Sequence, residues 1–158
     1  MTDTIRTGGC QCGAVRFRVT GPLGRPSICH CRMCQKHFGG FFSALVTAPK
    51  GGVEWTRKEP SYFQSSVNIE RGFCDQCGTP LTYRHQEGLE LAIGAFDDRS
   101  DLKPQIQVNY AARIPWVTEL FDAPVHDDAA YYSRQEAIIS FQHPDHDTEN
   151  WPEQGLKL

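Results

Sequence analysis

The sequence predicts a mainly β domain of short strands, with one short helix near the C-terminus. Segments rich in strand-forming residues, some with period-two alternation, recur between residues 14 and 121. Glycine, proline and aspartate turn signals separate these segments. The chain has 158 residues, enough for one domain with a hydrophobic core. Short strands at regular spacing are typical of a β-sandwich or of barrel-like sheet packing.

The expected strands follow one another along most of the chain. The first reads AVRFRV, and its alternation places Val15, Phe17 and Val19 on one face. The second reads FFSALVT and follows a Gly-Gly turn. The remaining expected strands are residues 61–66, 80–84, 89–96, 105–110 and 116–121.

A capping pattern marks the expected C-terminal helix. Ser133 is the candidate N-cap and Glu136 the residue that reaches back to it. The apolar residues of segment 137–141 follow, and Pro144 ends the helix. Beyond it the sequence is polar apart from Trp151, so we expect a loosely held tail.

Composition and charge limit the class of protein. The chain is 39% hydrophobic and 22% charged, as in ordinary globular proteins, and its net charge of −3 argues against nucleic acid as the main partner. No leader-like segment and no run of about 18 apolar residues is present, so we expect a cytoplasmic protein that spans no membrane. In that compartment the seven cysteines are expected to bind metal or do chemistry rather than pair as disulfides.

Four of the cysteines form a candidate structural zinc site. In GFCDQCGTPL, Cys74 and Cys77 have the spacing with which a tight turn grips one tetrahedral Zn²⁺. Gly78 permits a positive φ angle at that turn. A closed site needs four ligands, and Cys10 and Cys12 can supply the other two. Such a site would contribute to stability rather than to catalysis.

Cys29, Cys31 and Cys34 remain, in the segment CHCRMC. A short helical turn there would place the thiolates near a helix N-terminus, where negative charge is stabilised. Zinc with three protein ligands keeps one position for water or substrate, which is the layout of catalytic zinc. His30, His37 or a distant carboxylate would instead close the site, and His37 is the better placed histidine.

The ligand set indicates which substrate an open site would take. Zinc with three thiolates has a formal charge of −1 and is a poor activator of water. It suits a soft fourth ligand, such as a substrate thiol bound as thiolate. A thiolate so held can attack a small carbonyl compound or be released from its adduct, which makes or breaks a carbon–sulfur bond.

The three motifs together resemble those of a known family. The order GGCQCGAV, CHCRMCQK and GFCDQCGTPL closely resembles the glutathione-dependent formaldehyde-activating enzyme family, which is also grouped with centromere protein V. The similarity covers about residues 8–120 and gives all seven cysteines a counterpart. Trp116 and the segment LFDAPVH resemble the family's C-terminal part, and the sequence after about Val125 lies outside the similarity.

The resemblance implies a β-tent fold of short antiparallel sheets clamped by zinc. It implies two zinc ions per chain, one structural and one catalytic, and it gives each cysteine a role. The structural ligands would be Cys10, Cys12, Cys74 and Cys77, and the catalytic ligands Cys29, Cys31 and Cys34. The family's named reaction condenses formaldehyde with glutathione, and the reverse reaction is that of a carbon–sulfur lyase. We therefore expect a zinc-binding domain at residues 1–125 and a helix and tail at 126–158.

Three functional hypotheses follow from these patterns. The first is a zinc-dependent carbon–sulfur lyase acting on the adduct of a thiol such as glutathione with a small aldehyde. The second is a binding module without enzymatic activity in which both metals are structural. The third is a thiol redox switch at Cys31 and Cys34. Candidate cations for the glutathione carboxylates are Arg32, Lys36, Arg71 and Arg113, and candidate pocket aromatics are Phe38, Phe41, Phe42 and Trp55.

Overall fold

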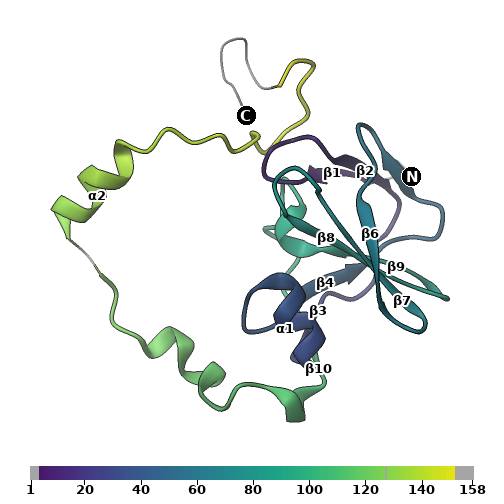
Figure 1. Ribbon diagram of the computed structural model, residues 1–158, viewed down its shortest axis with the longest axis horizontal. Coiled ribbons are helices and arrows are strands. Elements are labelled where there is room, and N and C mark those ends of the chain that lie inside the picture. Colours follow the sequence, from purple (N-terminus) through teal and green to yellow (C-terminus); the bar gives the residue numbers. More distant parts are fainter. Residues whose placement is uncertain (1–3, 127, 152–158) are drawn as a thin grey trace.

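Two β-sheets form the body of the protein in the computed structural model, which describes residues 4–126 and 128–151. Figure 1 shows the strands gathered on one side and a long arm of chain on the other. The strands are β1 Ile5–Gly9, β2 Arg16–Thr20, β3 Ser27–Cys29, β4 Ser43–Thr47, β5 Val53–Trp55, β6 Ser61–Ser66, β7 Ile69–Phe73, β8 Pro80–His85, β9 Gly88–Ala92 and β10 Ile106–Val108. The helices are α1 Arg32–Phe38, α2 Ala129–Glu136 and the 3₁₀ helices η1 Ile93–Ala95, η2 Tyr110–Ala112 and η3 Pro115–Asp122.

The smaller sheet has the order β1-β2-β5, and both of its pairings are antiparallel. The larger sheet has the order β10-β3-β4-β9-β8-β7-β6. Its pairings are antiparallel except for β10, which runs parallel to β3. The prediction of a mainly β fold with short antiparallel strands is confirmed. Among the described residues, no helix has both the length and the apolar character needed to cross a bilayer.

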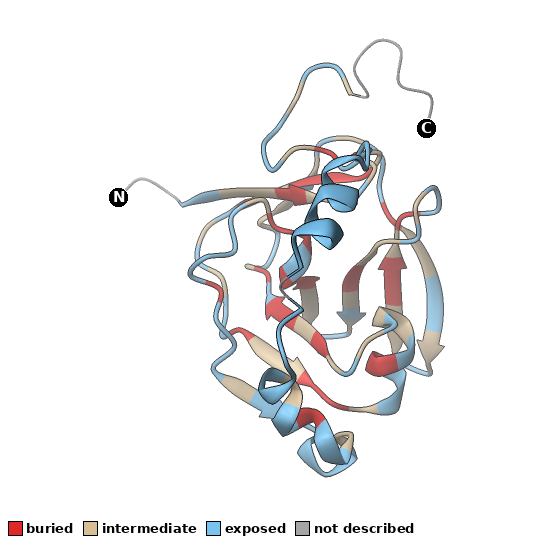
Figure 2. Cartoon of the chain, turned by 90° about the vertical axis from the view of Figure 1, so that its left-hand side faces the viewer, coloured by how far each residue is buried: buried red, intermediate tan, exposed pale blue. Residues whose placement is uncertain are grey.

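Side chains from both sheets pack into one hydrophobic core. The predicted inward face of β2 is confirmed, because Phe17 and Val19 are fully buried together with Val15 just before the strand. The ring of Phe17 makes edge contacts with Phe96 and Trp55, at 5.2 and 6.0 Å between ring centroids. Trp55, a predicted pocket aromatic, therefore packs against the core. Figure 2 shows the buried residues concentrated in the strands.

The expected strand at residues 116–121 is wrong, because this segment is the 3₁₀ helix η3. Pro115 occupies the first helical turn, where its fixed φ angle and missing N–H fit a helix start. The segment lies outside both sheets, and no strand among the described residues pairs with it. Its strand-forming residues are mostly exposed, and Phe121 keeps 94% of its surface in solvent. Strand propensity without a neighbouring strand does not produce a sheet.

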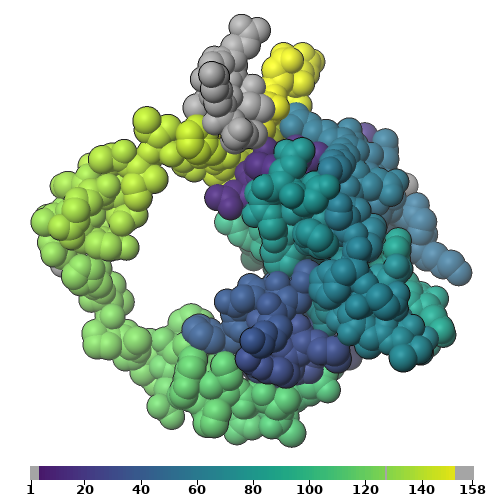
Figure 3. Space-filling model, viewed as in Figure 1, coloured from purple at the N-terminus to yellow at the C-terminus, as the bar shows by residue number. Residues whose placement is uncertain are grey.

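The C-terminal helix is present, but its predicted bounds are wrong. Helix α2 begins after Asp128, whose side chain accepts a hydrogen bond from the Ala130 N–H at 2.8 Å. Ser133, the predicted N-cap, lies inside the helix and donates to the Ala129 carbonyl. The helix ends before the apolar segment 137–141, whose residues Ile138 and Ile139 are exposed. Figures 1 and 3 show this region as part of an arm that arcs away from the sheets.

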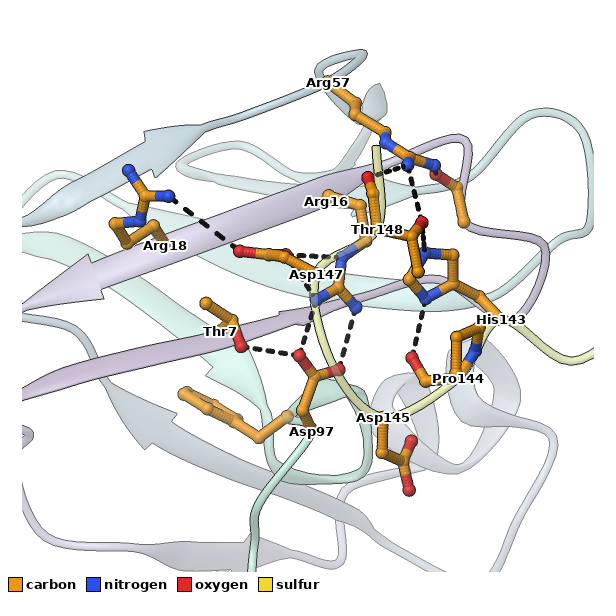
Figure 4. Close-up of polar contacts among 12 residues, drawn as sticks. Thr7, Arg16, Arg18, Arg57, Asp97, His143, Pro144, Asp145, Asp147 and Thr148 are labelled. Atoms are coloured by element: carbon orange, nitrogen blue, oxygen red, sulfur yellow. Dashed lines mark hydrogen bonds and ion pairs between the residues drawn. The ribbon is translucent and has the colours of Figure 1, made fainter. Parts of the chain in front are cut away.

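The expected loosely held tail is also wrong for the described residues. The chain returns from the arm at His143, which is buried and donates its backbone N–H to the Gln11 carbonyl at 2.8 Å. Asp147 accepts from Arg16 at 2.7 Å, and the Thr148 carbonyl accepts from Arg57 at 2.7 Å (Figure 4). These polar contacts are long-range in sequence, so a local reading of residues 143–151 could not detect them.

Candidate metal centres

The structure brings Cys10, Cys12, Cys74 and Cys77 together, with all four sulfur atoms within 4.8 Å of one another. The Cys10 and Cys12 sulfurs are 3.5 Å apart, and those of Cys12 and Cys74 are 3.8 Å apart. Zinc–sulfur bonds of about 2.3 Å in a tetrahedron separate the sulfurs by about 3.8 Å. The four thiols, here called the quartet, therefore fit one tetrahedral zinc ion.

Two turns hold the quartet. The Cys74 turn closes with a hydrogen bond from the Gly78 N–H to the Cys74 carbonyl at 2.8 Å. Gly78 has a φ angle of 76°, the left-handed conformation for which a glycine was expected. On the other side, the Val15 N–H donates to the Cys10 sulfur at 3.3 Å. A backbone donor of this kind stabilises a thiolate ligand.

The quartet thiols differ in their tendency to ionise. Burial raises the pKa of Cys10, and it also raises the pKa of Cys12. Burial acts in the same direction on Cys77, but hydrogen bonding from the Thr79 hydroxyl and backbone outweighs it and lowers the pKa of Cys77 to about 6. Thr79 lies 3.1 Å from the Cys77 sulfur. A cation bound by all four sulfurs would remove the cost of ionising Cys10 and Cys12.

The docked C-terminal segment covers the quartet. The Trp151 indole N–H donates to the Cys12 carbonyl at 3.1 Å, and Arg57 donates to the Gly13 carbonyl at 2.9 Å. His143 makes its backbone bond to Gln11, between the first two cysteines. These contacts hold the segment beside the quartet, of which Cys10 and Cys74 are buried and Cys12 and Cys77 half-buried.

Cys29, Cys31 and Cys34 form the second cluster, here called the trio, with sulfurs within 4.8 Å of one another. Cys29 ends β3, and Cys31 is the N-cap of α1, where its sulfur accepts from the Cys34 N–H at 3.4 Å. The predicted short helical turn is thus confirmed. Gly39 ends α1 with a φ angle of 61°.

Neither histidine that could have closed the trio belongs to it. Within the described part of the chain, the trio contains no histidine, aspartate or glutamate. The His30 Nε2 atom bonds the Gln107 side chain at 2.8 Å. His37 packs edge-on against Phe38 and also contacts Phe63, and burial lowers the pKa of His37 to about 4. The geometry therefore leaves one side of the trio without a protein ligand from these residue types.

Two side-chain donors from outside β3 and α1 contact the trio sulfurs. Asn109, directly after β10, donates its side-chain N–H to Cys29 at 3.3 Å. Arg71, on β7, donates from Nη2 to Cys34 at 3.4 Å. Hydrogen bonding from Cys29 lowers the pKa of Cys34, and Arg71 acts in the same direction. The same hydrogen bond with Cys34, together with burial, raises the pKa of Cys29.

A cavity of about 290 Å³ opens beside the trio. Its apolar walls include Met33, Leu45 and Ile69. Its polar lining comes from Arg71, Tyr83, Glu90 and Asn109. Burial raises the pKa of Glu90 and also that of Tyr83. A cavity of this kind, with apolar walls and a few convergent polar groups, is typical of a small-molecule site.

Of the candidate substrate cations, only Arg71 lies in this cavity. Arg32 bonds Gln35 within α1, and the Arg113 guanidinium stacks over the Tyr110 ring at 4.1 Å. Lys36 is exposed on α1. Among the aromatics, Phe38 and Phe42 line a different hollow, and Phe41 packs against Trp116.

Sequence reasoning missed Asn109, Tyr83 and Glu90. Asn109 has a φ angle of 52°, and no other non-glycine residue in the described part of the chain has a positive value. Such strain is often found at functional sites, but it is not visible in sequence. Tyr83 and Glu90 face each other across the β8–β9 pairing, and only that register brings them to the thiols.

Comparisons with known proteins agree with the motif pattern. Residues 5–112 match the family model described as "Glutathione-dependent formaldehyde-activating enzyme". A protein of Halomonas elongata named "Putative glutathione-dependent formaldehyde-activating enzyme" is 36% identical, over 47% of this chain and 52% of its own length. An uncharacterized lyase of Schizosaccharomyces pombe is 31% identical, over 51% of this chain and 58% of its own length. The matches thus span only about half the length of these relatives. A crystal structure of a Rhodobacter sphaeroides protein superposes with a TM-score of 0.51 at 19% identity, over 64% of this chain and 98% of that one, and shows the same fold.

Proposed function

The chain belongs to the glutathione-dependent formaldehyde-activating enzyme family, and from this premise we propose that it is a zinc-dependent carbon–sulfur lyase. Its substrate is the adduct of a small aldehyde with a thiol such as glutathione. The observation that carries the proposal is the trio beside an open cavity, with no histidine or carboxylate of the described residues completing the set. The two relatives support the reaction class through their names.

The donor sets support zinc at both clusters. Four thiols at tetrahedral spacing match a structural zinc site, and three thiols that face a cavity match a catalytic one. We assign the quartet to the structural ion and the trio to the catalytic ion. The ion held by the trio would supply a position that takes the substrate thiol as thiolate.

The residues around the trio have separate tasks in this proposal. Asn109 and Arg71 donate hydrogen bonds to the sulfurs of Cys29 and Cys34 and so stabilise their negative charge. Met33, Leu45 and Ile69 line the cavity with apolar surface that limits water around the reacting carbon. At about 290 Å³ the cavity admits the thiol end of a substrate together with a small aldehyde.

Two cysteine substitutions test the proposal. Cys31→Ser should abolish the consumption of formaldehyde in the presence of glutathione, while the protein keeps one zinc ion and its fold. Cys77→Ser should lose the structural ion and unfold, because structural zinc contributes folding free energy directly. The assays are formaldehyde consumption, zinc per chain and circular dichroism under reducing conditions.

The outcome separates the enzyme from its rival. If Cys31→Ser unfolds as completely as Cys77→Ser, both metals are structural and the protein is better described as a zinc-clamped binding module. If Cys31→Ser keeps full activity, the trio is not the catalytic centre.

A further inference from the structure

Arg71 is the largest fully buried side chain among the described residues, with 1% of its surface exposed. It lies in the middle of β7, opposite Tyr83 on β8 and Phe63 on β6. A guanidinium is always charged, and its burial costs free energy unless anions and hydrogen-bond acceptors surround it. The contacts of Arg71 should therefore show which groups balance its buried charge.

The hydrogen bonds of this guanidinium leave one nitrogen unused. Nε donates to the Ser65 hydroxyl at 2.9 Å, and Nη2 donates to the Cys34 sulfur at 3.4 Å. The guanidinium carbon lies 5.0 Å from the centre of the Tyr83 ring. Nη1 is buried and has no partner among the described residues. A buried charged donor without an acceptor is costly, so an acceptor that is not part of this chain is expected there.

The free nitrogen belongs to a residue that lines the trio cavity. Glu90 lines the same cavity, but no ion pair joins its carboxylate to Arg71 in the described structure. The Cys34 sulfur accepts from Nη2 of Arg71 and leaves Nη1 without an acceptor. Arg71 therefore lines the cavity and keeps one buried donor for which the described residues supply no acceptor.

We propose that Nη1 of Arg71 is a catalytic hydrogen-bond donor that holds the oxygen of the aldehyde adduct. The assignment rests on the proposed lyase function and extends it to substrate choice. The cavity would select thiol adducts in which an oxygen atom lies within one or two bonds of the carbon bonded to sulfur. Simple thioethers and alkyl thiols of the same size lack that oxygen and would leave the buried donor unpaired, which is the basis of strong discrimination.

The reaction explains why a cation is useful at that point. In the condensing direction the substrate thiolate donates an electron pair to the carbonyl carbon, a C–S bond forms, and the C–O π pair moves to oxygen. The proton that the thiol released on ionising returns through water to this oxygen, so none is gained or lost. In the lyase direction the hydroxyl loses that proton, the C–O double bond forms, and the C–S pair returns to sulfur. In both directions negative charge develops on the oxygen, where a fixed donor lowers the barrier.

Three variants separate this role from a structural one. Arg71→Met removes the donor, and Arg71→Lys keeps the charge without the planar fork. Arg84→Met is the matched control. Arg84 lies on the neighbouring strand β8, stacks over the Tyr62 ring at 3.9 Å and pairs with Glu70, but it lines a different hollow.

The test uses zinc-loaded protein and two probes measured by calorimetry. Mercaptoacetate carries an anionic oxygen near its thiol, and ethanethiol has the same two-carbon thiol without it. We expect the wild type to prefer mercaptoacetate. Arg71→Met should lose about 10- to 100-fold of that preference, the range of one charged hydrogen bond, because loss of the bond to Cys34 affects both probes alike while loss of Nη1 affects mercaptoacetate alone. Arg71→Lys should recover part of it, and Arg84→Met should match the wild type.

The binding preferences of the variants show whether Arg71 holds the substrate oxygen or has only a structural role. If Arg71→Met and Arg71→Lys both keep the wild-type preference, or weaken both probes equally with loss of zinc, Arg71 is structural and the inference is wrong. If the wild type binds neither thiol, the lyase proposal itself fails, and this inference fails with it. Zinc content and the unfolding midpoint are measured for each variant, so a folding defect is recognised as such.

Discussion

Replacing Asp97 with asparagine should destabilise the protein strongly, because Asp97 is half of a buried ion pair. Arg16 and Asp97 expose only 3% and 10% of their side chains. Two hydrogen bonds join them, the first from Nη1 to Oδ1 at 2.8 Å, and the Thr7 hydroxyl also donates to the carboxylate at 2.6 Å. Figure 4 shows that Asp147, from the docked C-terminal segment, contacts the same guanidinium.

The expected cost follows from this arrangement. Removing one member of a buried pair costs roughly 3–5 kcal/mol, because the other charge is left buried without its partner. Asp147 still contacts Arg16 in the variant, so we expect the lower end, about 3 kcal/mol. For a chain of this length that cost corresponds to a fall in Tm of about 6–12 °C.

The measurement is urea unfolding of zinc-loaded protein at pH 7 under reducing conditions. The control is Asp101→Asn. Asp101 lies four residues further on and pairs with Arg6 at the surface, with 59% of its side chain exposed. Exposed pairs contribute little to stability, so the midpoint of the control should hardly move. If Asp97→Asn costs no more than Asp101→Asn, burial does not govern the strength of this pair and the reasoning fails.

Three further results are expected. Burial acts to raise the pKa of Asp97, but hydrogen bonding from Arg16 outweighs it and lowers that pKa, so the carboxylate gives its full contribution to stability at any pH above the pKa of aspartate in the unfolded chain. The free-energy cost of Asp97→Asn, measured by unfolding at several pH values, should therefore stay constant between about pH 5.5 and 8. A cost that falls across this range would contradict the assignment. Gly13→Ala should release the C-terminal segment and speed its cleavage by a protease. Gly13 has a φ angle of 74°, and an added Cβ would collide with the His143 ring. An unchanged cleavage rate would show that Gly13 is not needed for docking of the segment. Asn109→Ala should weaken zinc binding by the trio about 10- to 100-fold through loss of the hydrogen bond to Cys29, as measured by competition with a chelator. Asn109→Gly also lacks this hydrogen bond but tolerates the left-handed backbone, so it controls for backbone strain. Equal zinc affinity in the wild type and both variants would show that Asn109 does not support the trio.

The cysteine clusters were predictable because ligand spacing is local. Cys74 and Cys77 define a turn within four residues, and the tetrahedral requirement for four ligands pointed to Cys10 and Cys12. The structure brings these four together as expected. The same subtraction left the trio, and its three thiols lie together as well. Their division into a structural and a catalytic zinc site stays a prediction, as does the domain boundary at residue 125.

The polar surroundings of the clusters were not predictable in the same way. The Asn109 contact with Cys29 depends on the parallel pairing of β10 with β3, which joins segments about 80 residues apart. The docking of residues 143–151 depends on contacts with Gln11, Arg16 and Arg57. These contacts cannot be predicted from the polar sequence of the tail alone. The strand expected at residues 116–121 failed for a related reason, since only tertiary structure supplies or withholds a pairing partner.

The quartet and the cavity are linked through one strand, which gives the proposed structural zinc a consequence for catalysis. Strand β7 carries Arg71 and ends directly before Cys74. The pairing of β7 with β8 shifts register between Gly72 and Phe73. Gly72 donates to the Thr82 hydroxyl at 3.0 Å, and a Cβ atom at Gly72 would collide with that oxygen, so the strand cannot carry a larger residue there without moving.

A slip of one residue in β7 would turn the Arg71 side chain to the opposite face of the sheet. The Cys74 turn opposes such a slip, because a metal held by all four quartet sulfurs would anchor the end of the strand to the turn after β1. The unfolding expected when the quartet loses its metal would therefore release Arg71 from its place beside the trio, although the trio ligands themselves come from β3 and α1. The proposed structural zinc site, whose ligand Cys74 lies three residues from Arg71, would then fix the position of the proposed hydrogen-bond donor.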